Sequence, residues 1–465
     1  MTGAASNPDP FELPTRFGPA LLACWCLAIT NTFSRGAYSE HALQFIVMAL
    51  LILTWRLVEA WFPRDRALVA SSALVLGVAW VGAFGMQWNA WNDPSIVIYA
   101  QKPWETGRQV EVASMGLLLT YLPFLSGRFR EPRWLRDLRF ALFVGLVIAA
   151  GVAAMRVSPK PDIDVWRVQQ IGADALIHGK NPFTAVAVRD TAPGVLRDNV
   201  PYVYPPTQVY LTVPGKFFGE DVRYSMLAAL VLIGIACRAI VRKSGLKLPA
   251  FAEDAPALFL WLTPKLFFIL EQAWVDPIQI CLITLAITAW VYRLRTLSLV
   301  LFGIVFSSKQ TMFWIAPLAG FTLRWKLRDW IIAGAVAVAM ELPFVIWDFK
   351  ALKYDNLDFL TALPPRPDAL TLTNWYQRKF GEPVTGQIAF VFAAIIVAVS
   401  SWKIRDSIAR FGVALAATYL FFFAFNKWAF ANYYFMTGAL AALAAAMAFH
   451  DPDLQPQERA GLRAS

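Results

Sequence analysis

The chain has 465 residues, of which 58% are hydrophobic and only 16% are charged, with 19 Trp and 35 Phe. A soluble protein carries about 25% charged residues, so the composition excludes an ordinary water-soluble enzyme or binding domain. The formal net charge of +10 lies in small groups between apolar stretches. This distribution argues against nucleic-acid binding and favours loops that face anionic lipid.

Apolar stretches of roughly the 20 residues that a transmembrane helix needs recur along the whole chain. The first follows a polar segment without the pattern of a cleavable signal, so we expect it to remain as a membrane helix. The sequence predicts an all-α polytopic membrane protein with about 14 transmembrane helices, in a range of roughly 12 to 15. The predicted spans are 17–34, 42–62, 67–87, 111–126, 139–157, 222–241, 256–273, 275–292, 296–309, 310–324, 329–347, 386–402, 409–426 and 428–448.

The predicted spans divide the chain into an N-terminal group, a core and a tail. Residues 1–138 hold about four spans, residues 139–448 hold the others, and residues 449–465 form a polar tail. The core contains two long loops, 158–221 and 348–385. The second is expected to be a lid, an acceptor platform or a structural cap, and the sequence does not decide between these.

Basic residues assign the sides of the predicted membrane helices. With the N-terminus in the cytoplasm, nearly all Lys and Arg of the short loops fall on the cytoplasmic side, as the positive-inside rule requires. An even number of spans then places both termini in the cytoplasm. The cytoplasmic basic residues are Arg64, Arg66, Arg128, Arg130, Arg133, Arg136, Arg139, Arg242, Lys243, Lys247, Arg293, Arg295, Arg324, Lys326, Arg328, Lys403, Arg405 and Arg410.

The stretch 202–218, YVYPPTQVYLTVPGKFF, is apolar but short and contains three prolines. Counting it as a span would move the downstream basic clusters to the outside. We therefore expect an interfacial or re-entrant helix that begins at Pro205-Pro206, because proline suits the first turn of a helix.

Cysteine and histidine give no sign of a metal site. Cys24, Cys26, Cys237 and Cys281 all lie inside apolar segments, where free cysteine behaves as a small buried hydrophobe. The three histidines are scattered. No metal and no cofactor are therefore expected.

Two acidic residues open the first long external loop. Asp162 and Asp164 follow a predicted span directly, and a helix is expected from Asp164 to His178, ending at Gly179. One of the two carboxylates suits a helix N-cap. The other suits a general base at the membrane boundary, where partial desolvation makes a carboxylate a better proton acceptor.

Polar residues also collect in three external turns that are too short to be solvated loops. The turns read EQAWVDP, SSKQT and FNKWAFANYY. Each cluster alone fits ordinary turn chemistry, but polar groups at membrane depth are costly, and their gathering on one side favours a site. The candidates are Glu271, Gln272, Trp274, Asp276, Ser307, Ser308, Lys309, Gln310, Asn426, Lys427, Trp428, Asn432, Tyr433 and Tyr434.

These residue types suggest a chemistry with an acid-base carboxylate, cations that hold an anionic leaving group, and aromatic faces for a sugar or a lipid. Lys309 and Lys427 are candidates for phosphate contacts as point charges, with Gln310 and Tyr204 beside them. Aromatic rings stack on sugars or line a lipid groove, a role that we assign to Tyr202, Tyr204, Trp274 and Trp375. Lys265 and Glu341, which lie inside apolar segments, are expected to be structural.

The order of a span, an acidic DIDVW loop, GKNPF and YVYPP resembles the multi-span glycosyltransferases of the C-type fold. The nearest family is glycosyltransferase family 87, the polyprenol-phosphate-mannose-dependent mannosyltransferases. Asp162 and Trp166 fit its acidic motif, while QAWVDP and SSKQT resemble its later motifs. The residues that fit its turn are Gly179, Asn181, Pro182 and Phe183. The resemblance covers roughly residues 139–435. In the family the acidic loop follows the first span, whereas here about four spans precede the span that comes directly before the loop.

The resemblance implies an inverting glycosyltransferase of the bacterial inner membrane with its active site on the periplasmic face. The donor would be a polyprenyl-phosphate sugar, and the acceptor a lipid-linked or cell-envelope glycan. Asp162 would be the general base, with Asp164 as second choice. The remaining residues of the implied substrate site are Trp166, Asn181, Tyr202, Gln272, Trp274, Asp276, Asn432 and Tyr433.

Other functions remain possible on the sequence alone. A transporter or lipid-carrier flippase would explain the spans together with Lys265 and Glu341, although such proteins often have paired halves with broken helices. A polysaccharide polymerase or ligase would share the outer-face site but use a diphosphate-linked donor. A membrane scaffold would not need acidic loops against the bilayer. The sequence does not indicate the oligomeric state.

Overall fold

A computed structural model describes residues 13–33, 35–62, 72–93, 96–125, 129, 131–190 and 197–451. Five helices in this part of the chain are long and apolar enough to cross a membrane, and further apolar helices are shorter. The prediction of a mostly helical membrane protein is confirmed at this level. The five are Glu40–Trp61, Ala73–Asn92, Arg133–Val157, Arg223–Lys243 and Leu327–Ala362.

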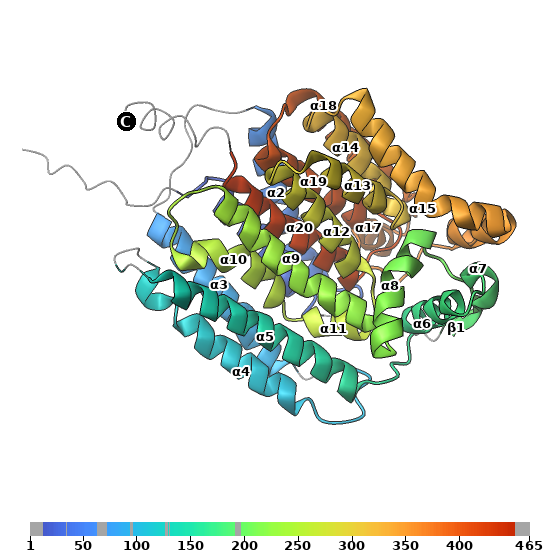
Figure 1. The fold of residues 1–465 in the computed structure, drawn as a ribbon, viewed down its shortest axis with the longest axis horizontal. Helices are drawn as coiled ribbons and strands as arrows, with labels where there is room; N and C mark the ends of the chain where they lie inside the picture. Colours follow the sequence, from blue (N-terminus) through green and yellow to red (C-terminus); the bar gives the residue numbers. More distant parts are fainter. Residues whose placement is uncertain are drawn as a thin grey trace, which may run out of the picture.

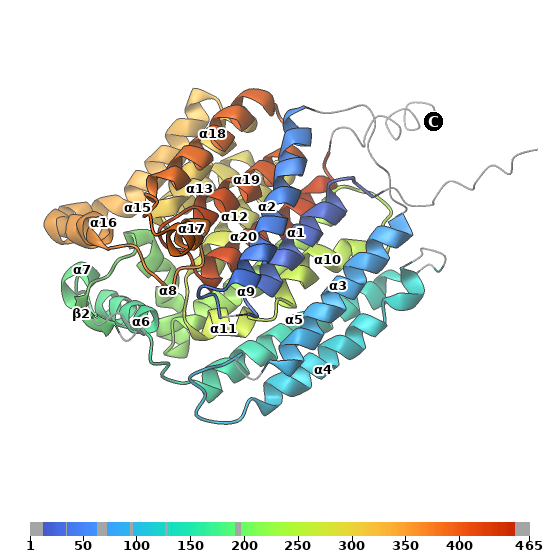
Figure 2. The same ribbon diagram turned by 180° about the vertical axis from the view of Figure 1, so that it is seen from behind.

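The first third of the chain contains the helices α1 to α5. α3, α4 and α5 lie side by side along one flank of the molecule in both ribbon views (Figures 1 and 2). The helices are α1 (Phe17–Thr30), α2 (Glu40–Trp61), α3 (Ser72–Asn92), α4 (Glu105–Leu119) and α5 (Arg133–Val157), with a 3-10 turn at Leu122–Phe124.

The first long loop folds into short helices and a hairpin at one end of the helical bundle (Figure 1). The predicted helix from Asp164 is confirmed, as is a helix that starts at the Pro205-Pro206 pair. The hairpin was not expected in an all-α protein. The elements are α6 (Asp164–Ile177), α7 (Pro182–Ala185), the antiparallel strands β1 (Val188–Asp190) and β2 (Arg197–Val200), and α8 (Pro206–Gly219).

The middle of the chain supplies helices of the core, one of which is broken. The predicted span 256–273 is interrupted after Trp261, where Thr263 and Pro264 separate α10 from α11. The helices are α9 (Arg223–Lys243), α10 (Ala250–Trp261), α11 (Leu266–Glu271), α12 (Asp276–Val291), α13 (Arg295–Phe306), the 3-10 turn η2 (Gln310–Trp314) and α14 (Ile315–Thr322).

The last third begins with the longest helix and ends with two buried ones. The helix over the predicted span 329–347 continues past a kink at Asp348 and then passes into a π turn, so part of the second long loop is helical. The elements are α15 (Leu327–Lys353), η3 (Tyr354–Asp358), α16 (Phe359–Ala362), α17 (Leu372–Phe380), α18 (Gln387–Lys403), α19 (Ile408–Ala424) and α20 (Ala431–Ala448).

At the centre of the bundle, helices from the beginning and the end of the described part of the chain pack together. α1 packs along α20, and α2 packs against α19. Phe17 meets the ring of Phe449 at 5.0 Å, and at the other end of the pair Asn31 donates to the carbonyl of Ala431 at 3.2 Å. α19 and α20 consist largely of buried Ala, Phe and Leu, so these helices form the core rather than its surface.

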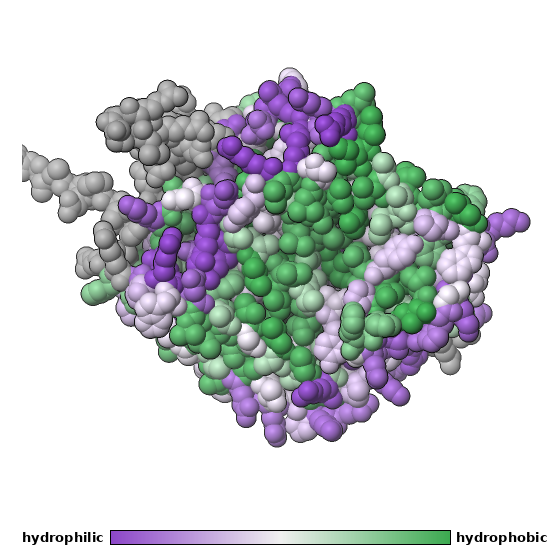
Figure 3. Space-filling view, in the orientation of Figure 1, coloured by the Kyte–Doolittle hydropathy of each residue, from purple (hydrophilic) through white to green (hydrophobic). Residues whose placement is uncertain are grey.

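An apolar belt crosses the surface of the molecule and separates two polar rims (Figure 3). We name the two ends of the bundle after residues. At the Asp276 end α5, α13 and α19 finish and α12 and α20 begin, whereas at the Arg242 end α9 and α12 finish and α5 begins. A belt between polar rims is the surface expected of a protein that sits in a bilayer.

Some predictions fall on residues that the structure does not describe. The basic residues Arg64, Arg66, Arg128 and Arg130 lie outside the described ranges, as does most of each terminal tail. The four cysteines are free and buried, as the sequence predicted.

Candidate functional site

The turns at the Asp276 end bring three predicted residues into one buried cluster. The ammonium of Lys309 lies 2.7 Å from Oδ1 of Asp276, and the side-chain amide of Asn432 donates to Oδ2 of the same carboxylate at 2.8 Å. Lys309 also lies 4.8 Å from the centre of the Tyr433 ring. Asp276, Lys309 and Asn432 are all buried. The cluster therefore combines a compensated charge pair with an aromatic face.

Helix geometry explains why these residues meet. Asp276 is the first residue of α12, and Asn432 lies in the first turn of α20, so both point from helix N-termini at the same end. A carboxylate in the first turn of a helix is stabilised by the helix dipole. Lys309 occupies the extended residue between α13 and η2, which lets its long side chain turn inward.

Tyr204 connects this cluster to the acidic loop. Burial raises the pKa of the Tyr204 hydroxyl well above its ordinary value, and the charges of Asp164, Tyr433 and Asp276 raise it further. These groups act on one hydroxyl, although they come from α6, α12 and α20. The hydroxyl of Tyr204 therefore lies within electrostatic range of Asp164, Tyr433 and Asp276.

The two acidic residues of the DIDVW motif have different surroundings. Asp164 begins α6, is partly buried, and accepts a hydrogen bond from the backbone N–H of Val165 at 2.8 Å. Asp162 is exposed and forms an ion pair with Arg167. Burial raises the pKa of Tyr99, and Asp162 and then Asp164 are among the charges that raise it further. The loop before α4 therefore approaches both carboxylates.

Trp166 is held by a buried arginine that the sequence analysis did not single out. Asp221 accepts from the indole N–H of Trp166 at 3.4 Å and from Nε of Arg223 at 3.0 Å. Arg223 also donates to the carbonyl of Ser158 at 2.9 Å and is fully buried. These bonds fix the start of the acidic loop against α9.

A layer of buried hydrogen bonds continues from the cluster into the bundle. Gln279, one turn into α12 from Asp276, donates to Oε1 of Gln208 at 2.7 Å, and Thr207 donates to Ser307 at 2.7 Å. All four residues are buried. The layer ties α8 to α12 and α13. The sequence signal for this layer was a glutamine in each of two apolar segments, Gln208 and Gln279, because a polar side chain buried there needs a hydrogen-bond partner.

Two predicted phosphate contacts serve as ties between loops. The amide of Gln310 donates to the carbonyl of Val203 at 2.9 Å and to Oδ1 of Asn356 at 3.1 Å. The ammonium of Lys427 donates to the carbonyl of Leu363 at 2.8 Å, and burial lowers the pKa of Lys427. Both residues join the second long loop to the rest of the Asp276 end.

The EQAWVDP turn is mainly a connection to the α3–α4 loop. Glu271 is buried and accepts from the backbone N–H groups of Ile98 and Tyr99, both at 2.8 Å. Gln272 is also buried, and Trp274 packs edge-on against Phe268 with ring centres 5.3 Å apart. Asp276 is the residue of this turn that reaches the cluster.

The remaining predicted site residues have structural contacts. Asn181 caps α7 by accepting from the N–H of Phe183 at 3.0 Å. Tyr202 is fully buried and donates to Gln169 at 3.1 Å, while Trp375 packs against Phe380. Their contacts shape the loops around the cluster.

Two intramembrane charges expected to be structural have separate locations. Lys265, at the break between α10 and α11, pairs with Asp93 at the end of α3. Glu341 lies in α15 on the side that faces Tyr210 of α8. In the described part of the chain, no three His, Cys, Asp or Glu side chains are grouped as metal ligands.

Comparisons with models of protein families, with curated proteins and with solved structures found no match to this chain.

Proposed function

We propose that the chain is an integral membrane glycosyltransferase with a fold similar to the C-type enzymes, as its resemblance to glycosyltransferase family 87 implies. The donor is a sugar, mannose or another hexose or pentose, on a polyprenyl phosphate. The acceptor is a lipid-linked or cell-envelope glycan. The observation that carries the proposal is the buried cluster of Asp276, Lys309 and Asn432, with Asp276 and Asp164 both within electrostatic range of Tyr204. Burying such polar groups at one end of a membrane bundle is costly, so they are candidates for a functional site.

The distribution of charge supports the orientation that belongs to this proposal. Arg136, Arg238 and Arg242 occupy the end opposite the cluster, and the positive-inside rule assigns that end to the cytoplasm. The cluster then faces the periplasm of a bacterial inner membrane. About 14 spans, with both termini cytoplasmic, complete this topology.

The proposed chemistry is an inverting displacement at the anomeric carbon. The acceptor hydroxyl attacks, its proton passes to a carboxylate, and the bond to the phosphate oxygen breaks to release the polyprenyl phosphate. Asp164 is the better base because it is partly buried and acts on Tyr204, whereas Asp162 is exposed and paired with Arg167. This choice reverses the order that the family motif favours.

Lys309 supplies positive charge for the leaving phosphate. The ion pair with Asp276 holds the ammonium in one place beside the Tyr433 ring, so little reorganisation is needed when negative charge develops. A cation can balance a monophosphate without a metal ion. We therefore expect full activity in the presence of EDTA, and activity restored only by a divalent cation would contradict this part of the proposal.

The test is transfer from labelled polyprenyl-phosphate mannose in membranes that contain the protein. We expect transfer by the wild type, loss in Asp164→Asn, and retention in Asp174→Asn, which changes an exposed carboxylate on the same helix. Loss in Asp162→Asn alone would move the base and keep the reaction class. The proposal fails if the wild type transfers no sugar from any lipid phosphate tested.

A transporter or lipid flippase is the second candidate, favoured by the break between α10 and α11. The buried pair of Lys265 and Asp93 sits at that break, and broken helices with buried charges are typical of substrate sites in transporters. Movement of a lipid-linked sugar across proteoliposomes without chemical transfer would favour this reading.

A further inference from the structure

A pocket opens at the Arg242 end, on the opposite side of the bundle from the candidate site. It has a volume of about 990 Å³ and lies between the start of α5, the end of α9 and the connection to α10. Apolar residues such as Phe129 and Leu246 line part of it. The charged groups on its wall are Arg133, Arg136, Arg242 and Lys247, with Glu131, Asp137 and Glu253.

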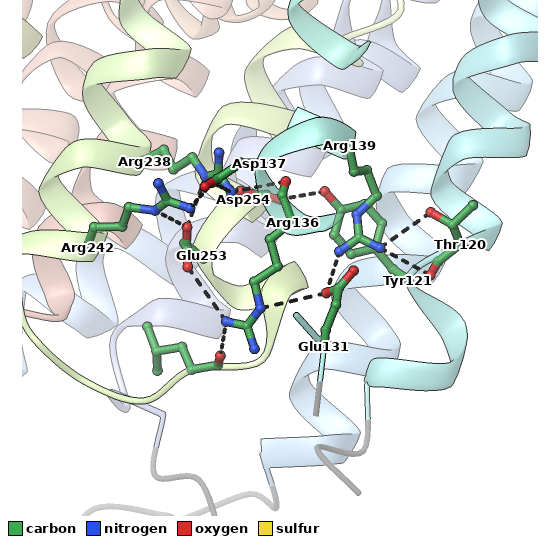
Figure 4. A network of polar contacts seen from close by, with 11 residues as sticks. Thr120, Tyr121, Glu131, Arg136, Asp137, Arg139, Arg238, Arg242, Glu253 and Asp254 are labelled. Carbon is green, nitrogen blue, oxygen red and sulfur yellow. Dashed lines mark hydrogen bonds and ion pairs between the residues drawn. The ribbon is translucent and has the colours of Figure 1, made fainter. Parts of the chain in front are cut away.

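Two of these cations are committed to the protein's own carboxylates. Arg242 pairs with Glu253 and Asp137, and Arg136 lies 3.8 Å from both Glu131 and Glu253 (Figure 4). Arg136 also donates to the carbonyl of Leu248 at 3.0 Å. These contacts build a rigid wall, because each group is held by several others.

The other two cations have fewer partners. Arg133 and Lys247 are exposed, and neither makes an ion pair or a side-chain hydrogen bond with any residue that the structure describes, while the charge of Arg133 acts on Asp137 over a longer distance. The pocket wall carries four cations and three carboxylates, and these carboxylates also pair with Arg139 and Arg238 behind the wall. Positive charge is therefore in excess, and an anionic occupant would balance it.

The wall of the pocket combines apolar residues with charged ones, as at the boundary between an apolar surface and a polar rim. Phe129 and Trp134 are exposed beside it, with 65% and 66% of their surfaces accessible. Aromatic side chains at such a boundary contact the headgroup region of a bilayer. Basic pockets between membrane helices recognise lipid headgroups by the same combination of charge and apolar surface.

We propose that this pocket binds the phosphate of an anionic glycerophospholipid from the leaflet at the Arg242 end. Arg133 and Lys247 contact the phosphodiester, and the committed network behind them fixes the shape of the site. The acyl chains extend from the pocket along the apolar belt. The excess of positive charge favours a lipid with net negative charge over a zwitterionic phosphatidylcholine. This inference is independent of the proposed sugar transfer.

The test compares lipid binding by the purified full chain in detergent. The protein is titrated with phosphatidylglycerol or phosphatidylcholine, and bound lipid is counted by native mass spectrometry. We expect phosphatidylglycerol to bind about tenfold more tightly, and the variant Arg133→Gln/Lys247→Gln to lose most of that preference. The control Arg324→Gln/Arg328→Gln removes two exposed arginines that do not line the pocket and should keep the preference.

Three outcomes would overturn the proposal. One is equal affinity for the two lipids, and another is an unchanged preference in Arg133→Gln/Lys247→Gln with a wild-type unfolding temperature. The third is binding of glycerol phosphate that the same variant abolishes, without binding of phosphatidylglycerol. That result would assign the pocket to a soluble phosphate.

Discussion

The two ends of the bundle bury charge in contrasting ways. At the Asp276 end one lysine and one aspartate form a pair, completed by the amide of Asn432. At the Arg242 end, the single carboxylate of Glu253 pairs with three arginines, Arg136, Arg238 and Arg242. The first arrangement depends on single partners, whereas in the second Glu253 has three cationic partners and Asp254 has Arg238 together with the hydroxyl of Tyr121.

We propose that this difference separates charges that hold helices together from a charge pair, Lys309 and Asp276, that takes part in sugar transfer. The network in Figure 4 links α5, α9 and α10, so its ion pairs hold these three helices together. Among the described residues, Asp276 has Lys309 as its one cationic partner. A structural role would be served equally by an apolar pair of the same volume, since buried ion pairs contribute little net stability.

The largest expected effect comes from breaking the single pair. Lys309→Met leaves the buried carboxylate of Asp276 with only Asn432, which costs about 3–5 kcal/mol of unfolding free energy. In the double variant Lys309→Met/Asp276→Asn we expect that loss to be largely recovered, because no charge remains unpaired. Sugar transfer should stay absent in both. Thermal unfolding in detergent and the transfer assay measure the two effects separately.

A double variant that is stable and transfers sugar at the wild-type rate would remove the distinction between the two ends. The pair would then be structural, like the network at the Arg242 end.

A smaller effect is expected from one arginine of the network. Arg238→Met removes ion pairs of 2.9 Å to Glu253 and 2.8 Å to Asp254. Glu253 keeps Arg242, and Asp254 keeps the hydroxyl of Tyr121 at 2.6 Å. We therefore expect a loss of about 2 kcal/mol, measured by the same unfolding assay.

The matched control for this arginine is Arg242→Gln, since the Arg242 side chain is 41% exposed and that of Arg238 only 7%. It should cost less than about 1 kcal/mol. If Arg238→Met destabilised the protein as much as Lys309→Met, redundancy would not distinguish the ends.

The smallest expected effect concerns the close contact between α6, which follows the acidic loop, and the ring of Tyr202. A Cβ at Gly172 of α6 would lie 2.5 Å from Cε2 of the buried Tyr202 ring, so Gly172→Ala must shift α6. We expect a loss of about 1–2 kcal/mol and slower sugar transfer, because Asp164 begins the same helix. Gly145→Ala in α5, where a Cβ meets nothing within 4 Å, is the control. Equal rates of sugar transfer in Gly172→Ala and Gly145→Ala would show that activity does not depend on the exact position of α6.

Much of the fold follows from patterns that the sequence displays directly. Apolar stretches and basic loops predict the helices, and the Pro205-Pro206 pair predicts the start of α8. Turn motifs at one end predict that Asp276, Lys309 and Asn432 lie close together. Membrane proteins allow this because side assignment restricts which turns can meet.

The sequence does not identify which partners each polar residue finds. Gln310 and Lys427 carry the same chemistry as Lys309, but they donate to carbonyls of neighbouring loops. The β1–β2 hairpin and the role of Arg223 depend on packing between segments far apart in the chain. Local patterns contain no information on such contacts, and our proposal of Asp164 in place of Asp162 as the base rests on contacts of this kind.

The contact between α1 and α20 has a consequence for how the protein is made. α1 is made long before α20, its principal neighbour among the described helices, with Arg16 and Asp451 paired at one end and Asn31 bound to Ala431 at the other. Synthesis proceeds from the N-terminus, so the contact between α1 and α20 forms only after α20 has been made. A chain truncated before α20 would therefore present an open seam along α1 to the membrane's quality-control proteases.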